Sequence, residues 1–227
     1  MPVLWDFERT LAKSERQVWG QLTTPMKIQA FLDELPYSVE KGYRCPLRVL
    51  RERVGHCFDG ALFAAAALLH LGNPPLILNM IATDEDDDHI LALYKRDGYW
   101  GAIAKSNFAG LRFREPVYRT LRELVMSYFE QFYNVEGKKT LRSYTVPLHL
   151  KAFDNHHWMI SDPPIEEIGK RLDEIRKVRI LTRGMIAGLS LVDERSYRAG
   201  LVGTNRAGLY QPYKRKTRKP EKFWRDF

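Results

Sequence analysis

The chain has 227 residues, of which 44% are hydrophobic, 12% aromatic and 28% charged. This is the composition of an ordinary globular protein, and it excludes a largely disordered chain apart from the extreme C-terminus. The formal net charge is +8, but seven Lys and Arg side chains fall within residues 214–227. The basic character therefore belongs mainly to this tail and indicates little about the partners of the rest of the protein.

Targeting and membrane signals are not evident in the sequence. The N-terminal residues carry scattered charges and lack the apolar run of a signal peptide. The most apolar stretch, Gly60 to Leu71, is too short to cross a bilayer. We therefore expect a cytoplasmic protein that does not contact membranes. Cys45 and Cys57 are too few for a secreted disulfide framework, so we expect both to be free thiols.

The first half of the chain predicts helices followed by a small antiparallel sheet. Hydrophobic periodicity favours helices over residues 5–22, 25–35, 46–53 and 59–71, the last rich in Ala and Leu. Strands are expected over residues 76–82, 89–94 and 99–105. The pair Asp97-Gly98 is a strong signal for a two-residue hairpin turn between the last two. Such a pattern predicts an α+β fold with a buried central helix.

The second half is less regular. We expect a helix near residues 120–132, a strand over 141–150 and a helix over 165–178, whereas residues 180–212 carry mixed signals. These expectations place a core domain at residues 1–150 and a C-terminal appendage at 151–227, ending in the basic tail 214–227.

Cys57 is the strongest candidate for a catalytic residue. It stands immediately before the long apolar helix, where free backbone N–H groups and the helix dipole favour an anion. A thiolate is such an anion, so this position is expected to lower the thiol pKa. The same N–H groups could stabilise the oxyanion of a tetrahedral intermediate.

His89 is the candidate base, because it opens the strand that returns toward the start of this helix. A third group usually orients such a histidine. A two-residue turn at Asp97-Gly98 would pair residue 89 with Ser106, whereas a bulge would bring Asn107 there. Asn107 ranks first because its amide carbonyl can accept the ring N–H, and Ser106 ranks second.

These motifs resemble the transglutaminase-like superfamily. The run GHCFDGALFAAAALLHLGNPP is similar to its nucleophile motif, and DDDHILALYKRDGYWGAIAKSNF is similar to its histidine strand, turn and tryptophan strand. The resemblance covers about residues 55–108 and implies a papain-like core, with Cys57 and His89 at the first two triad positions. Trp100 matches the tryptophan that precedes the third, where the family has Asp and this chain has Lys105-Ser106-Asn107.

Four other residues are candidate parts of the substrate site. His56 could tune the thiol or line the cleft, and Asp59 could simply complement the helix dipole. Arg112 and Arg114 could bind phosphate or carboxylate groups of a substrate, or form internal ion pairs. The acidic run at 84–88 lacks the glycine and glutamate of an EF-hand, and it could rim the cleft and favour basic substrates.

No metal or organic cofactor is expected. His149, His156 and His157 do not have the spacing of a zinc site. Cys45 is expected to be structural.

The predicted activity is cysteine-dependent acyl transfer or hydrolysis, acting on a protein, peptide or small amide. Two alternatives remain open: an inactive protein of the same fold that uses the cleft for binding, and a nucleic-acid-binding protein acting weakly through the basic tail. The sequence gives no oligomeric state.

Overall fold

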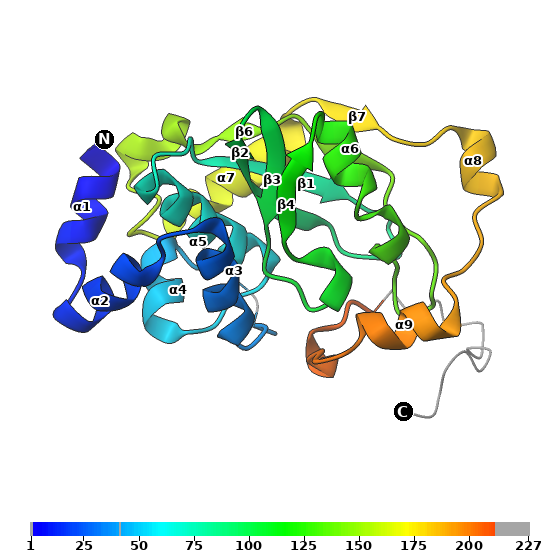
Figure 1. Cartoon of the computed structure of the whole chain (residues 1–227), viewed down its shortest axis with the longest axis horizontal. Helices are drawn as coiled ribbons and strands as arrows, with labels where there is room; N and C mark the ends of the chain where they lie inside the picture. Colours follow the sequence, from blue (N-terminus) through cyan, green and yellow to red (C-terminus); the bar gives the residue numbers. More distant parts are fainter. Residues whose placement is uncertain (1, 41, 212–227) are drawn as a thin grey trace.

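The computed structural model describes residues 2–40 and 42–211, so the predicted basic tail at 214–227 lies outside the described residues. The fold is α+β, as predicted: helices α1–α5 lie on one side of an antiparallel sheet, and α6, α8 and α9 lie on the other (Figure 1). No helix among residues 2–40 and 42–211 is long and apolar enough to cross a membrane.

The N-terminal helices are α1 (Pro2–Thr10), α2 (Lys13–Gln21), α3 (Pro25–Glu34) and α4 (Pro46–Glu52). Residues 5–22 thus form two helices where the sequence predicted one. The chain turns after Leu11 because the Glu15 carboxylate accepts a hydrogen bond from the Ala12 N–H at 2.7 Å and starts α2. The turn also brings the rings of Phe7 and Trp19 to a centroid distance of 4.8 Å, burying both.

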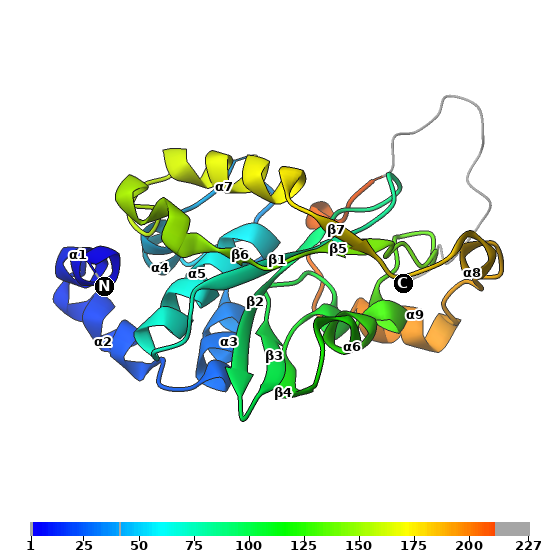
Figure 2. The same cartoon turned by 90° about the horizontal axis from the view of Figure 1, so that it is seen from above.

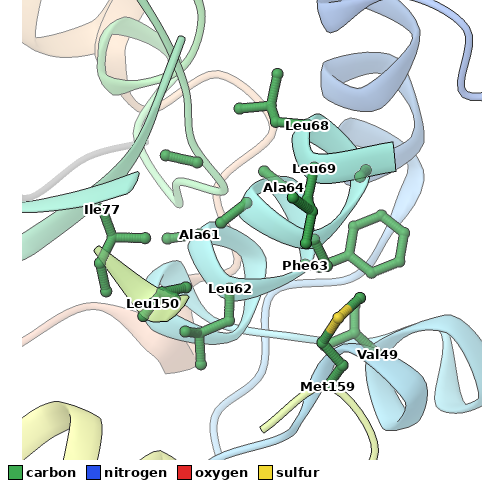
Figure 3. Packing of buried hydrophobic residues seen from close by; sticks show 14 of the residues in the cluster. Val49, Ala61, Leu62, Phe63, Ala64, Leu68, Leu69, Ile77, Leu150 and Met159 are labelled. Carbon is green, nitrogen blue, oxygen red and sulfur yellow. The ribbon is translucent and has the colours of Figure 1, made fainter. Parts of the chain in front are cut away.

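Helix α5 (Cys57–His70) is the centre of the larger hydrophobic cluster. Every residue from Ala61 to Leu68 is fully buried, as expected for a helix that is apolar on all sides. Figure 3 shows its Ala, Leu and Phe side chains meeting residues of α4, β1 and the segment that follows β6. The helix therefore cannot shift without disturbing several elements, which fixes the position of its first residue.

The sheet has the order β4-β3-β2-β1-β5-β7, and β6 also pairs with β1. Its strands are β1 (Leu76–Ile81), β2 (His89–Arg96), β3 (Tyr99–Ile103), β4 (Arg114–Tyr118), β5 (Ser143–Thr145), β6 (Leu148–His149) and β7 (Lys177–Arg179). The predicted hairpin is confirmed, with Arg96 opposite Tyr99 and positive φ at both Asp97 and Gly98. Strand β4 lies between the strand predicted at 99–105 and the helix predicted near 120–132, where the sequence predicts no element.

The two faces of the sheet belong to different clusters. Ile90, Ala92 and Tyr94 of β2 pack in the cluster of α5. Leu91 and Leu93 pack in a second cluster, which includes α6 (Leu121–Met126) and Phe132. Because side chains alternate along a strand, odd-numbered residues of β2 face away from α5.

The chain after residue 150 continues the same core. It forms the 3-10 turns η3 (Leu150–His156) and η4 (Arg206–Gly208), helices α7 (Pro163–Glu174), α8 (Arg183–Ala187) and α9 (Glu194–Gly200), and strand β7. Trp158, Met159 and side chains of α7 belong to the α5 cluster, and β7 extends the sheet. The sheet and core therefore run across the expected boundary at residue 150.

Three predicted elements are shorter than expected. The helix predicted over 165–178 ends at Glu174, because residues 177–179 instead pair with β5. The strand predicted over 141–150 is divided into β5 and β6 by Pro147, which has no N–H for a ladder. The helix predicted near 120–132 is α6 followed by the 3-10 turn η2 (Phe129–Gln131).

Candidate active site

The start of α5 is fixed by the segment that precedes α4. Gly55 N–H donates to the Pro36 carbonyl at 3.4 Å, and Ser38 N–H donates to the Gly55 carbonyl at 3.1 Å. This short parallel pairing places Tyr37 beside Cys57. The Tyr37 hydroxyl hydrogen-bonds to the Cys57 thiol and accepts a hydrogen bond from the Cys57 backbone N–H. Tyr37 was not identified from the sequence, because its contact depends on this non-local pairing.

His56 and Asp59 cap the helix. His56 Nδ1 accepts from the Phe58 N–H at 3.2 Å, and the fully buried Asp59 carboxylate accepts from the N–H groups of His56 at 3.2 Å and Arg44 at 2.8 Å. Burial raises the pKa of Asp59. The two residues form a capping box, and both are thereby committed to holding the first turn of α5.

The Cys57 thiol is partly exposed, with its sulfur 3.9 Å from the Asp88 carbonyl and a hydrogen bond from the Ile90 N–H. Burial and the negative charge of Asp87 raise the pKa of Cys57 to about 12. The thiol is therefore protonated at neutral pH, which is the opposite of the expected shift. The reason is that the first N–H groups of α5 already have acceptors, the Tyr37 hydroxyl and the His56 ring, and burial opposes the charge.

His89 is buried at the start of β2. Its Nε2 lies 2.8 Å from the Leu111 carbonyl, and its ring lies near Phe132, on the face turned away from α5. Burial lowers the pKa of His89 to about 4, so the ring is neutral. Since a carbonyl only accepts, Nε2 carries the proton and Nδ1 is left as the basic nitrogen. No hydrogen bond joins the Cys57 sulfur to the His89 ring in the described part of the chain.

The partner expected for His89 is different in the structure. The β2–β3 ladder ends at Ala92 opposite Ile103, so residue 89 does not pair with 106. Ser106 Oγ instead accepts from the Phe108 N–H at 3.0 Å, and Asn107 binds the main chain of Asn205. The Leu111 carbonyl orients the ring in their place. A main-chain carbonyl has no sequence signature, so this partner could not have been predicted.

The predicted substrate-binding residues on β3 and beyond have internal partners. The Lys95 Nζ lies 4.2 Å above the Trp100 ring, near the hairpin turn and remote from the His89 end of β2. Arg112 is 3.2 Å from an Asp33 carboxylate oxygen. The Arg114 guanidinium lies 3.8 Å from the centre of the Tyr128 ring and donates to carbonyls of Gly110 and Ser127. Both arginines thus make the internal contacts that the sequence left as the alternative.

Cys45 and the histidines outside the site have structural surroundings. Cys45 is a buried free thiol whose N–H donates to the Asp162 carboxylate at 2.9 Å, and burial raises its pKa to about 12. His149 Nδ1 accepts from the Lys151 N–H at 3.2 Å, and His156 pairs with Glu167 at 2.8 Å. His157 is exposed, with its Nδ1 at 4.0 Å from an Asp6 oxygen. Within residues 2–40 and 42–211, no three His, Cys, Asp or Glu residues are grouped for a metal ion.

Comparison with known proteins gives a distant structural likeness only. No protein-family model and no curated protein sequence matches this chain. Two solved structures of LapG from Legionella pneumophila, one of them EGTA-treated, are similar at 14% identity and a TM-score of 0.34. Each covers 45% of this chain, and 70% and 68% of the respective LapG chains. A TM-score this low does not support transfer of a site or an activity.

Proposed function

We propose that the protein is a cysteine-dependent hydrolase or acyltransferase of amide or peptide bonds, built on a papain-like core, with Cys57 as nucleophile and His89 as base. One observation carries the proposal. The Cys57 sulfur lies against the backbone on both sides of His89, next to the Asp88 carbonyl and the Ile90 N–H. A nucleophile and a base that are distant in sequence are thus adjacent in the fold.

The tautomer of His89 supports this assignment. Its Nε2–H is held by the Leu111 carbonyl, which leaves Nδ1 to accept a proton. The ring lies on the face of the sheet away from α5, so proton transfer requires a side-chain rotation of Cys57 or His89. Leu111 would position the base, as a third triad member does in related chemistry.

The proposed reaction is nucleophilic acyl transfer. The Cys57 sulfur attacks the substrate carbonyl carbon while its proton passes to His89 Nδ1, giving a tetrahedral oxyanion. The Cys57 N–H, released from the Tyr37 hydroxyl, and the Ile90 N–H are donors for that oxyanion. Collapse breaks the C–N bond, the amine leaves with the proton from His89, and a thioester remains. Water or a second amine then takes the acyl group and restores the thiol.

A binding protein without catalysis is the second candidate. The observation in its favour is the protonated thiol, because the pKa of Cys57 is raised to about 12 and a thiolate is the active nucleophile. Binding of nucleic acid through the basic tail concerns residues outside the described part of the chain.

The test is turnover of a mixed library of peptides and simple amides by the purified protein, with amine release as the readout. We expect Cys57→Ser and His89→Gln to lower kcat by about 100-fold or more. Cys45→Ser, which changes the other free thiol, should retain the activity of the wild-type protein. An acyl adduct on Cys57, detected by mass spectrometry, would identify the thioester. Undiminished turnover by Cys57→Ser would contradict the proposal, and an inert wild-type protein that still binds peptides would favour the second candidate.

A further inference from the structure

The end of the described chain returns to the candidate active site. Residues Thr204–Tyr210, here named the strap, follow α9 and include the short turn η4. Figure 2 shows this segment passing beside the loop between β1 and β2. Its residues are exposed or only half-buried, and they add little to the hydrophobic clusters. The strap therefore contributes little apolar surface to these clusters, and polar contacts with the rest of the protein help to hold it in place.

Asn107 makes the most specific of these contacts. Its Oδ1 accepts from the Asn205 N–H at 2.8 Å, and its Nδ2 donates to the Asn205 carbonyl at 2.9 Å. The Thr204 hydroxyl also donates to the Asn107 carbonyl at 2.8 Å. The Asn107 amide binds both the N–H and the carbonyl of one extended residue, Asn205. This arrangement recognises the peptide main chain and does not depend on which side chain the bound residue carries.

The strap reaches both sides of Cys57. On one side, Asn205 Nδ2 donates to the Tyr37 carbonyl at 3.1 Å, and Gly208 lies against the Tyr37 ring. The Tyr37 hydroxyl in turn contacts the Cys57 thiol and N–H. On the other side, the Tyr210 hydroxyl donates to the carbonyl of Asp84, at the start of the acidic run that leads to Asp88. The strap thus contacts Tyr37, which contacts the nucleophile, and it also contacts the acidic run that leads to Asp88.

Gly208 shows a steric requirement of this position. A Cβ built on it would lie 3.0 Å from a Tyr37 ring carbon, 3.3 Å from Asn107 Nδ2 and 3.4 Å from a Val39 methyl. A larger residue would have to displace the ring or leave the site. Position 208, which follows the residue bound by Asn107 by three residues, therefore favours glycine over larger residues.

We propose that the strap occupies the peptide-binding subsite of the candidate active site, and that Asn107 binds the main chain of a substrate peptide there. The preferred peptide has an extended residue at the Asn107 position and glycine three residues later. The strap is then an autoinhibitory segment that a substrate must displace. The proposal depends on the proposed function only for the role of Cys57 as the nucleophile.

The experiment measures the rate at which iodoacetamide alkylates Cys57 in the full chain carrying Cys45→Ser. Two variants are designed to release the strap. Gly208→Val crowds the Tyr37 ring. Asn205→Pro removes the backbone N–H that donates to Asn107, and the φ of residue 205, −77°, is one that proline can adopt. We expect each to speed alkylation about tenfold, as when one or two exposed hydrogen bonds are lost. Val202→Ala, at a 73% exposed residue just outside the strap, is the matched control and should leave the rate unchanged.

A peptide with the sequence of residues 202–211 is then added to the released variants. We expect it to restore slow alkylation, whereas the same peptide with valine in place of Gly208 should not. Adding Asn107→Leu to the released variants should abolish protection by the peptide. Hydrogen exchange at the amides of residues 207–209, which both variants retain, verifies that the strap has been released.

The proposal would be overturned if the alkylation rate of Cys57 stayed unchanged while hydrogen exchange showed that the strap had been released. It would also be overturned if the peptide still protected Cys57 in the Asn107→Leu background. If hydrogen exchange shows that neither substitution releases the strap, Asn107→Leu removes the Asn107–Asn205 contact by changing Asn107 instead. An unchanged alkylation rate in that variant would also overturn the proposal. These readouts need no turnover. If the peptide protects Cys57 but the protein turns over no amide, the subsite proposal stands and the proposed enzyme activity is contradicted. If the protein turns over amides but the strap variants have no effect, the enzyme activity stands and the subsite proposal is contradicted.

Discussion

At the scale of single residues, burial decides the charge states around Cys57. The thiol is protonated, and the His89 ring is neutral, because each ionised form would lose hydration without gaining a charged partner. The Leu111 carbonyl fixes the His89 tautomer but carries no net charge to stabilise an imidazolium. Because the pKa of His89 is lower in the folded than in the unfolded state, the free energy of unfolding depends on pH.

We predict that His89 makes the protein less stable as the pH falls. The folded pKa of about 4 lies below the ordinary value of 6.5, so the unfolded chain binds the proton first. This contribution is complete above pH 6.5 and is lost as the pH falls toward 4, by about 3 kcal/mol in total. Urea unfolding of wild-type and His89→Gln protein over this range measures the difference. If the curve for His89→Gln matched that of the wild-type protein, this histidine would not titrate as stated.

At the scale of elements, α5 is joined to the end of β3 by one close approach. The Lys105 side chain crosses above Gly60 and donates from Nζ to the carbonyls of Leu32, at 2.8 Å, and Leu35. These carbonyls end α3, so one lysine satisfies groups that the helix leaves unpaired. Burial lowers the pKa of Lys105 to about 8. A Cβ on Gly60 would lie 2.2 Å from Lys105 Cβ, so only glycine permits this crossing.

We predict opposite effects for two glycine-to-alanine changes in helices. Gly60→Ala should lower the free energy of unfolding by about 2–4 kcal/mol, because the clash with Lys105 exceeds the gain of about 1 kcal/mol in helix propensity. Gly20→Ala in α2, with nothing within 4 Å of the new Cβ, should raise it by about 0.5–1 kcal/mol. Chemical denaturation of both variants gives the comparison. A neutral or stabilising Gly60→Ala would mean that the contact can relax.

At the scale of the whole molecule, the chain on both sides of residue 150 builds one core. Trp158 is fully buried in the α5 cluster, and its indole N–H donates to Asp154 at 3.2 Å. The N–H of Leu47 in α4 also donates to the Met159 carbonyl at 2.9 Å. The later segment therefore packs on the helices formed near the N-terminus, which implies that the two parts unfold together.

We predict that Trp158→Ala lowers the free energy of unfolding by about 3–5 kcal/mol in a single transition. Trp5→Ala, at a tryptophan that is 58% exposed, should change it far less. Circular dichroism and tryptophan fluorescence should give coincident denaturation curves for both variants. Two separate transitions in Trp158→Ala would show that the region after residue 150 unfolds on its own.

Local patterns were sufficient for much of the fold. The apolar run of α5, the hydrophobic period of α3 and the Asp97-Gly98 turn each depend on neighbouring residues, and all three are where the sequence placed them. The break between α1 and α2 was missed because its N-cap residue, Ala12, is not one of the residue types that mark a helix start. Strand β4 was missed because its extended backbone depends on pairing with β3, which local sequence does not reveal.

The sequence by itself determined that a cysteine begins a buried helix and that a histidine begins the second strand of the sheet. Both follow from apolar periodicity and turn residues, which act over a few positions. Only the tertiary structure decided the protonation of Cys57, the Leu111 partner of His89 and the return of the strap to Asn107 and Tyr37. Those features depend on burial and on main-chain groups distant in sequence, and residue type alone does not specify where such groups meet.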